Sequence, residues 1–272
     1  MKINVPQIDW LTFTTWKDAD FRAWQGWQNE QPGELKAGKI RMYEGIWRGN
    51  SFIGEGRQGN KSHGLVRVSG AESHEAFYQL SECGYTKCTR LDVQVTTPLP
   101  LGYSARQFAD DIRAGQGEQF KRAVRLLEND DGLDTVYIGS GSSDRFARFY
   151  VKLVDEVRYL RFEVEFKAEW ADLIARDLQT NENVLSGVLM DFISSIGVDD
   201  TQGVIKMFSD LLVSAKAGLK LGYDVRDKNK TLEWILEQVT PAMIRLLHDH
   251  EIGSYLANHL NSLVERHFYD KE

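Results

Sequence analysis

The first hundred residues alternate mainly between apolar and polar positions, and this period of two indicates β-strands. Strands are predicted over residues 8–14 and 89–97, the last ending at the prolines that follow, and strands with glycine-containing turns over 39–52 and 62–69. Ser104 and Gln107 have the spacing of a helix capping box. A helix is therefore predicted after Ser104, with a break near Gly115–Gly117 and a second part that continues through Leu127.

Period two then returns, and helical spacing replaces it for the rest of the chain. Further strands are predicted over 135–139, 145–153 and 159–166, and helices from Ala168 onward with breaks near Gly197, 222–230 and Thr240. Strands followed by a run of helices indicate an α+β fold. We expect an antiparallel sheet with the active site on one face and helices on the other. The sheet-rich catalytic core would span 1–167, and the helical region 168–272 would pack on it or form a small second lobe. No repeat with a period of 20–50 residues is visible.

Composition narrows the class of protein. The chain has 272 residues, of which 42% are hydrophobic, so wholesale disorder is excluded. Cys83 and Cys88 are too few for a disulfide framework or a zinc ribbon, and we expect reduced thiols. No run approaches the length of a membrane-spanning helix, and the first residues lack the apolar stretch of a signal peptide. A cytoplasmic protein without membrane contact is expected.

The charge is uneven along the chain. The net charge of −7 argues against a protein that coats nucleic acid without specificity. Residues 36–67, however, contain seven Lys and Arg against two Glu, interleaved with Tyr43, Trp47 and Phe52. Cations and aromatic rings together favour a contact with single-stranded or groove DNA, through Arg41, Arg48 and Lys61. The alternative is a set of glycine-rich hairpins with solvated charges.

Three predicted strands each have an apolar side and a charged side. The charged sides carry Arg90, Asp92 and Gln94, then Arg148, Tyr150 and Lys152, then Arg161, Glu163 and Glu165. If these strands are neighbours, three carboxylates converge and need a cation or basic side chains to neutralise them. Carboxylate oxygens suit Mg²⁺ or Mn²⁺. The alternative is a solvated sheet face with cross-strand Arg–Glu pairs.

Two further motifs bear on the chemistry. Residues 137–143 are small and rich in donors, so Ser140 and Ser143 could hold phosphate oxygens. His248 and His250 have the end spacing of a His-hydrophobic-His metal strand, but a charged residue separates them in helical sequence. We assign no metal site there.

Residues 135–140, 143–152 and 161–165 together resemble the signature of rolling-circle replication initiation factors. These are plasmid Rep proteins of the staphylococcal type and related relaxases of conjugative elements. Residues 8–14, 90–92 and 231–241 are also similar. The resemblance implies a metal-dependent DNA strand transferase that nicks and rejoins one strand at an origin. In this chemistry a tyrosine attacks the scissile phosphate and stays bound to the 5′ end.

The resemblance also implies roles for single residues. Tyr150 matches the nucleophile, Arg148 and Lys152 its basic neighbours, and Asp92, Glu163 and Glu165 the acidic positions associated with Mg²⁺ or Mn²⁺. The residues expected to contact DNA are Arg41, Arg48, Lys61, Arg90, Ser140, Ser143 and Arg161. The expected partners are origin DNA, single-stranded or as a hairpin, a host helicase and a second copy of the chain. Two alternatives stay open: a non-catalytic DNA-binding regulator of the same family, and a protein-interaction module.

Overall fold

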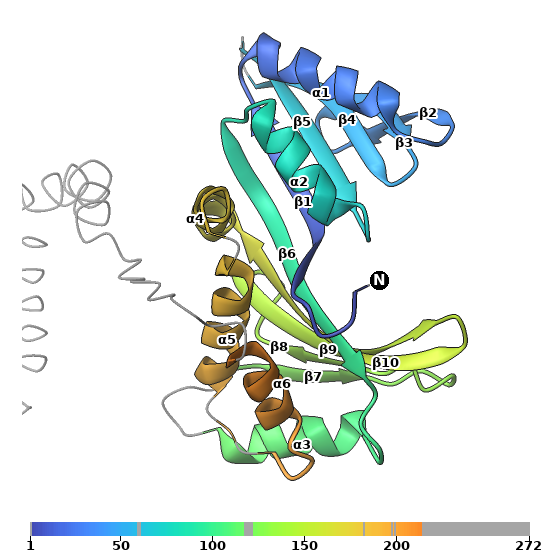
Figure 1. The fold of residues 1–272 in the computed structure, drawn as a ribbon, viewed down its shortest axis with the longest axis vertical. Coiled ribbons are helices and arrows are strands. Elements are labelled where there is room, and N and C mark those ends of the chain that lie inside the picture. The colour runs from blue at the N-terminus through green and yellow to red at the C-terminus, as the bar shows by residue number, and fades with distance from the viewer. Residues whose placement is uncertain are drawn as a thin grey trace, which may run out of the picture. The chain divides into compact units, whose positions relative to one another are not determined.

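The computed structural model describes residues 2–58, 61–116, 122–181, 183–196, 198 and 200–213 (Figure 1). All of them lie in the compact unit Met1–Lys220. The strands are β1 (Gln7–Thr15), β2 (Leu35–Ile40), β3 (Tyr43–Arg48), β4 (Ser51–Gln58), β5 (Lys61–Ser69), β6 (Lys87–Pro98), β7 (Val124–Leu127), β8 (Thr135–Ile138), β9 (Arg145–Val154) and β10 (Val157–Lys167). The helices are α1 (Asp18–Glu30), α2 (Ser73–Glu82), α3 (Ala105–Gly115), α4 (Ala168–Leu178), α5 (Val184–Ile196) and α6 (Val204–Val213).

The described strands form one antiparallel sheet in the order β2-β3-β4-β5-β1-β6-β10-β9-β8-β7. The predicted α+β class is therefore confirmed. Figure 1 shows α1 and α2 beside β1, β4 and β5, and α3, α5 and α6 beside the strands of the other half. The core lies between helices and sheet. Phe149 of β9 and Phe162 of β10 stack at 4.5 Å between ring centroids, and both rings also contact Phe208 of α6. The opposite face of the sheet, which we call the open face, carries the predicted charged residues on β6, β9 and β10.

The sheet consists of two halves with the same order of elements. In chain order, β1, α1, β2 to β5 and α2 are followed by β6, α3, β7 to β10 and α4. The strand order also reads the same from either edge, with β1 and β6 at the centre. Leu11 and Leu91 face each other across these central strands. This duplication was not predicted, because it repeats topology and not a sequence pattern.

Several predicted elements need correction. The helix that begins after Ser104 is confirmed, with the Ser104 hydroxyl accepting from Gln107 N–H at 3.3 Å. Its predicted continuation through Leu127 is wrong, because Val124–Leu127 is an edge strand paired with β8. Residues 39–52, predicted as strands with glycine-containing turns, belong to a β-meander. The turn at Gly49 agrees with the prediction, whereas the other turn, near Arg41, contains no glycine; both residues have positive φ.

Helices α1 and α2 were not predicted at all. In α1 the buried face includes Asp20 and Gln28 beside Trp24, so the apolar periodicity is weak. The hydroxyl of Thr15 donates to Asp20 at 2.8 Å, and the Gln28 amide donates to the Ile46 carbonyl at 3.1 Å. Tertiary partners therefore stabilise polar positions that an isolated helix would expose.

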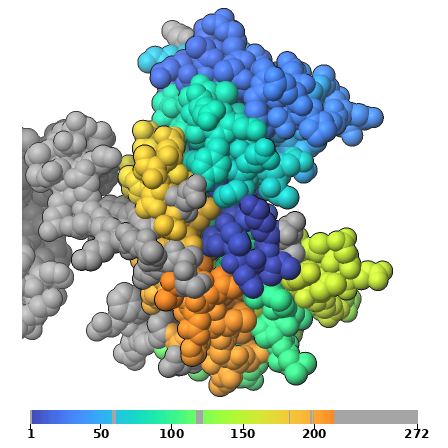
Figure 2. Space-filling view, viewed as in Figure 1, coloured from blue at the N-terminus to red at the C-terminus, as the bar shows by residue number. Residues whose placement is uncertain are grey.

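Some predictions stay open. The helical interruptions beyond residue 213, the segment 231–241 and the pair His248 and His250 lie outside the described residues. The boundary between 167 and 168 stays a prediction. Cys83 and Cys88 are both free thiols. No helix among the described residues has the length and hydropathy needed to cross a bilayer. Figure 2 shows the dark-blue N-terminal segment at the surface, where Asn4 N–H donates to the Thr96 carbonyl of β6 at 2.8 Å.

Candidate active site

The three predicted carboxylates gather on the open face. Asp92 of β6 lies directly opposite Glu165 of β10, and Glu163 lies two positions before Glu165 on the same strand. The prediction that their strands are neighbours is thus confirmed. The alternative, a solvated face with cross-strand Arg–Glu pairs, is half right. The pairs Arg90–Glu165 and Arg148–Glu163 are present, but the face is not solvated, because the exposed fractions are 0% for Asp92, 1% for Glu163 and 7% for Glu165. Basic side chains from the neighbouring positions are only partly exposed and cover these carboxylates.

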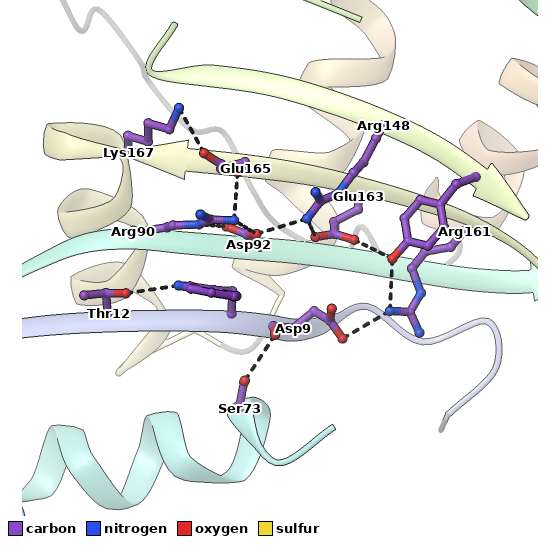
Figure 3. A network of polar contacts seen from close by, with 12 residues as sticks. Asp9, Thr12, Ser73, Arg90, Asp92, Arg148, Arg161, Glu163, Glu165 and Lys167 are labelled. Atoms are coloured by element: carbon purple, nitrogen blue, oxygen red, sulfur yellow. Dashed lines mark hydrogen bonds and ion pairs between the residues drawn. The ribbon is translucent and has the colours of Figure 1, made fainter. Parts of the chain in front are cut away.

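Each carboxylate is paired with basic side chains (Figure 3). Arg90 bridges Asp92 at 2.6 Å and Glu165 at 2.8 Å through the same Nη2. Arg148 of β9 bridges Asp92 at 3.3 Å and Glu163. Lys167 contacts Glu165 at 2.9 Å. Burial raises the pKa of Asp92 to about 7, although Arg90 opposes this change. The ion pairs therefore hold buried charges that would otherwise be very costly.

Tyr150 lies at the end of this network. Its hydroxyl donates to Glu163 Oε2 at 2.7 Å and accepts from Arg161 Nη1 at 3.3 Å. Burial and the Glu163 carboxylate raise the pKa of Tyr150 above its ordinary value, whereas Arg161 opposes the change. The phenol is therefore protonated at neutral pH and needs a base to act as a nucleophile. Glu163 stands within reach of that proton.

Arg161 has a larger part in this site than the sequence indicated. It was predicted to contact DNA, but its exposed fraction is only 2%. Its Nε donates to the Thr96 hydroxyl at 3.0 Å and its Nη1 donates to Asp9 at 3.1 Å. The guanidinium thus links β1, β6 and the Tyr150 hydroxyl. A cation in this position stabilises negative charge that develops on the phenol oxygen.

Asp9 was not predicted as a site residue. The pairing of β1 with β6 shifts register between Ile8 and Trp10, which places a β-bulge at Asp9. A bulge turns a side chain away from strict alternation, and bulges are common beside active sites. Here it aims the Asp9 carboxylate at Arg161. The sequence contains a signal for this bulge, because the apolar residues Ile8 and Leu11 lie three positions apart, whereas strict alternation would require an even spacing. The structure buries both.

The remaining predicted DNA contacts are spread over the sheet. Arg41 is exposed in the β2–β3 turn, and Lys61 is exposed at the start of β5. Arg48 instead has a structural role, because its Nη1 donates to the Gln31 carbonyl at 3.0 Å and the Gln28 carbonyl at 3.3 Å at the end of α1. We therefore leave Arg48 out of the proposed DNA surface.

Lys152 and the serine turn lie close to the carboxylate network. Lys152 is half-buried and forms no ion pair with any residue that the structure describes, and burial lowers its pKa. Ser140 and Ser143 belong to the β8–β9 turn, where the Ser140 carbonyl accepts from Ser143 N–H at 2.9 Å. The carbonyl of Gly141 in the same turn accepts from Lys167, which also contacts Glu165. The turn therefore borders the charged site.

The open face of this half has a slight excess of positive charge. Four carboxylates, those of Asp9, Asp92, Glu163 and Glu165, meet five basic groups, those of Arg90, Arg148, Lys152, Arg161 and Lys167. This excess of positive charge favours the approach of a phosphate.

The comparisons with known proteins concern the fold. The structure is similar to that of a rolling circle replication initiator protein from Geobacillus stearothermophilus. The TM-score is 0.55 at 16% sequence identity, and the match covers 76% of this chain and 96% of that chain. This likeness shows a shared fold, which is the fold that the sequence motifs imply.

The other comparisons add little. The structure of DynU16, a protein from the dynemicin biosynthetic locus, has a TM-score of 0.22 at 9% identity, and the match covers 63% of this chain and 92% of that chain. A similarity this low supports no conclusion about this chain. No family model and no curated protein matches the sequence.

Proposed function

We propose that this chain is a rolling-circle replication initiator or relaxase that nicks one DNA strand with Tyr150. The observation that carries the proposal is the geometry around the Tyr150 hydroxyl. A carboxylate lies 2.7 Å away to accept its proton, and a buried guanidinium lies 3.3 Å away to stabilise the oxygen. A nucleophile, a base and a cation in contact are what nucleophilic catalysis requires. The fold shared with a replication initiator supports DNA as the substrate.

The proposed step is one transesterification. Tyr150 Oη attacks the scissile phosphorus while its proton passes to Glu163 Oε2. The bond between phosphorus and the 3′ oxygen breaks, and the leaving oxygen takes a proton from Glu163. The products are a 3′-hydroxyl end and a 5′-phosphotyrosine. Arg148 and Arg161 lie where they can offset negative charge on the phenol oxygen and on the phosphorane.

The proposal includes Mg²⁺ or Mn²⁺ at Asp92, Glu163 and Glu165. The donor chemistry fits, because three carboxylates on adjacent strands supply the oxygen ligands that these ions prefer. In the described part of the chain, however, no group of three or more His, Cys, Asp or Glu side chains is arranged to hold a metal ion. The guanidiniums of Arg90 and Arg148 form ion pairs with the carboxylates instead. Metal binding would therefore need both guanidiniums to move aside. A bound cation would withdraw charge from the phosphate oxygens.

Origin DNA is the proposed partner, single-stranded or as a hairpin. The helicase, the second copy of the chain and the cytoplasmic location belong to the same proposal, and their support is the family resemblance alone.

The non-catalytic alternative also has an observation in its favour. Every carboxylate of the cluster is already neutralised by a basic side chain, which is how a purely structural network would look. A DNA-binding regulator would keep this network and form no covalent product.

A trapping assay separates the two functions. The full chain is incubated with a pool of labelled single-stranded oligonucleotides of random sequence, in EDTA, Mg²⁺ or Mn²⁺, and resolved under denaturing conditions. We expect a covalent adduct with Mg²⁺ or Mn²⁺, in which mass spectrometry finds DNA phosphate on Tyr150. Binding of the pool without any adduct would support the regulator. An equal amount of adduct in EDTA would mean that Tyr150 nicks DNA without a metal ion.

A further inference from the structure

A cavity of about 220 Å³ lies beside Tyr150 and has no role in the proposed step. Its walls come from the first residues of β1 including the bulge at Asp9, the turn that follows β5, Gln94 of β6, and the paired strands β9 and β10 near Lys152 and Arg161. Its volume is below the roughly 300–1,000 Å³ typical of pockets for drug-sized ligands. The cavity therefore suits a smaller group.

The cavity is connected to the nucleophile. Arg161 forms part of its wall and also donates to the Tyr150 hydroxyl at 3.3 Å. Lys152 lines it as well and lies two residues after Tyr150 on the same side of β9. A strand rises about 3.3 Å per residue, so these two positions are roughly 7 Å apart. A group in the cavity is thus next to any phosphate that Tyr150 attacks.

The lining combines apolar walls with polar edges. Ile8, Ala71 and Val154 supply the apolar part, whereas Gln7 and Gln94, which face each other across β1 and β6, supply amide groups. A nucleobase has the same character, since its faces are apolar and its edge carries donors and acceptors. Lys152, which has no ion pair among the described residues, adds a cation for the adjoining phosphate.

Asp9 gives the cavity a preference among the bases. Its Oδ1 accepts from Arg161, and an ionised carboxylate can only accept hydrogen bonds. Adenine, cytosine and guanine have an exocyclic amino group that can donate to it, whereas thymine offers only its ring N3–H, which lies between two carbonyl oxygens that repel a carboxylate. The carboxylate therefore disfavours thymine.

We propose that this cavity receives one unpaired base of the nicked strand, adjacent to the scissile phosphate, and selects a base with an amino group. The inference rests on the proposed strand transfer and adds a source of origin specificity to it. The bulge at Asp9 builds the site, because strict alternation would have turned this carboxylate into the core.

The test begins with the oligonucleotide that the trapping assay yields, since the adduct defines the nick. Each position from three residues before to three residues after the nick is made abasic in turn. Binding of each DNA is measured by fluorescence anisotropy with full-length Tyr150→Phe protein, so cleavage does not enter. We expect one position at which the abasic residue weakens binding on the order of tenfold, and thymine at that position to weaken it similarly.

Two variants in the same Tyr150→Phe background locate the effect. Ala71 lies in an exposed turn, so Ala71→Leu fills the cavity with little risk to folding, and it should abolish sensitivity to the abasic residue. Asp9→Asn should reduce the discrimination against thymine, since an amide can also donate. Ala37→Leu on exposed β2 is the matched control and should retain both effects.

Each outcome decides a different question. If the adduct forms but no position is sensitive, or if Ala71→Leu leaves the sensitivity unchanged, the base site is wrong and the proposed strand transfer stands. If no adduct forms under any condition, the strand transfer is wrong and the base site falls with it.

Discussion

The two halves of the sheet share a topology and differ in what their open faces carry. The two halves can be aligned on the central pair of Leu11 and Leu91. In this alignment the cross-strand pair of Thr12 and Arg67 in the first half takes the place of Asp92 and Glu165 in the second. On the next strand outward, Gly54 and Gly56 take the places of Arg148 and Tyr150. The first half therefore lacks the nucleophile and the carboxylates.

The first half fills its open face with apolar side chains. Ile40, Phe52 and Leu65 form a buried cluster with Tyr43 and Trp47 packed against it. Trp10 lies between the halves, with the guanidinium carbons of Arg67 at 4.9 Å and Arg90 at 4.3 Å from its ring centroid. The same scaffold thus stabilises one half by hydrophobic burial and the other by charge pairing. The charge-paired face is the one that places a carboxylate within reach of a tyrosine proton.

The sharpest test of this contrast compares one tyrosine from each half. Tyr150→Phe should abolish the covalent DNA adduct, because it removes the attacking oxygen and almost no volume. Tyr43→Phe, in the apolar cluster, should leave adduct formation within about twofold of the wild type. The measurement is the yield of adduct on a denaturing gel. Adduct at the wild-type level in Tyr150→Phe would mean that another residue is the nucleophile.

The proposed base gives the next largest effect. Glu163→Gln keeps the shape of the side chain but cannot accept the Tyr150 proton, so the single-turnover nicking rate should fall by about 10² to 10⁴. The matched control is Glu55→Gln on the exposed part of β4 in the first half. We would abandon Glu163 as the base if its variant nicked as fast as the control.

The third test measures how much the ion pair of Arg161 contributes to stability. Arg161 takes the position that His63 has in the first half. Arg161→Met should lower the free energy of unfolding by about 3 kcal/mol, because it leaves Asp9 without its cation. Adding Asp9→Asn should recover part of that decrease. Chemical denaturation provides the values. Equal stability of both variants and the wild type would show that the ion pair contributes nothing net.

The first half can still contribute to DNA binding through its edge. Arg41→Ala and Lys61→Ala together should flatten the dependence of log affinity on log salt, by about 0.7 to 0.9 for each phosphate that a removed cation had neutralised. Arg106→Ala is the control, since Arg106 lies on α3 and pairs with Glu128. An unchanged slope would leave the β2–β5 hairpins with a purely structural role.

The smallest expected effect is a pH dependence in the first half. His63 is 5% exposed, and burial lowers its pKa below the ordinary value. The unfolded chain then binds a proton more readily than the folded chain, so the free energy of unfolding should decrease as the pH falls below about 6.5. His63→Gln should reduce this decrease, as measured by denaturation between pH 5 and pH 7.5 (about the range in which histidine titrates). A pH dependence identical in both proteins would assign it to other groups.

Local sequence patterns were enough to predict four strands of the second half, β6, β8, β9 and β10, and the two faces of β6, β9 and β10. Alternation places Asp92, Tyr150 and Glu163 on the charged side, because successive side chains of a strand point to opposite faces. The helix after Ser104 followed from its capping residues. These features depend on residues close together in the chain, so they could be predicted without the fold.

Which strands pair, and what the charged side chains contact, depended on tertiary structure. The duplication of the two halves and the strand at Val124–Leu127 arise from pairing between distant segments. The roles of Asp9 and Arg161 depend on a bulge and on burial, which bring β1 and β10 together although their residues are far apart in sequence. Period two assigns a side chain to a face, but it cannot tell whether that face is solvated or closed over by its own ion pairs.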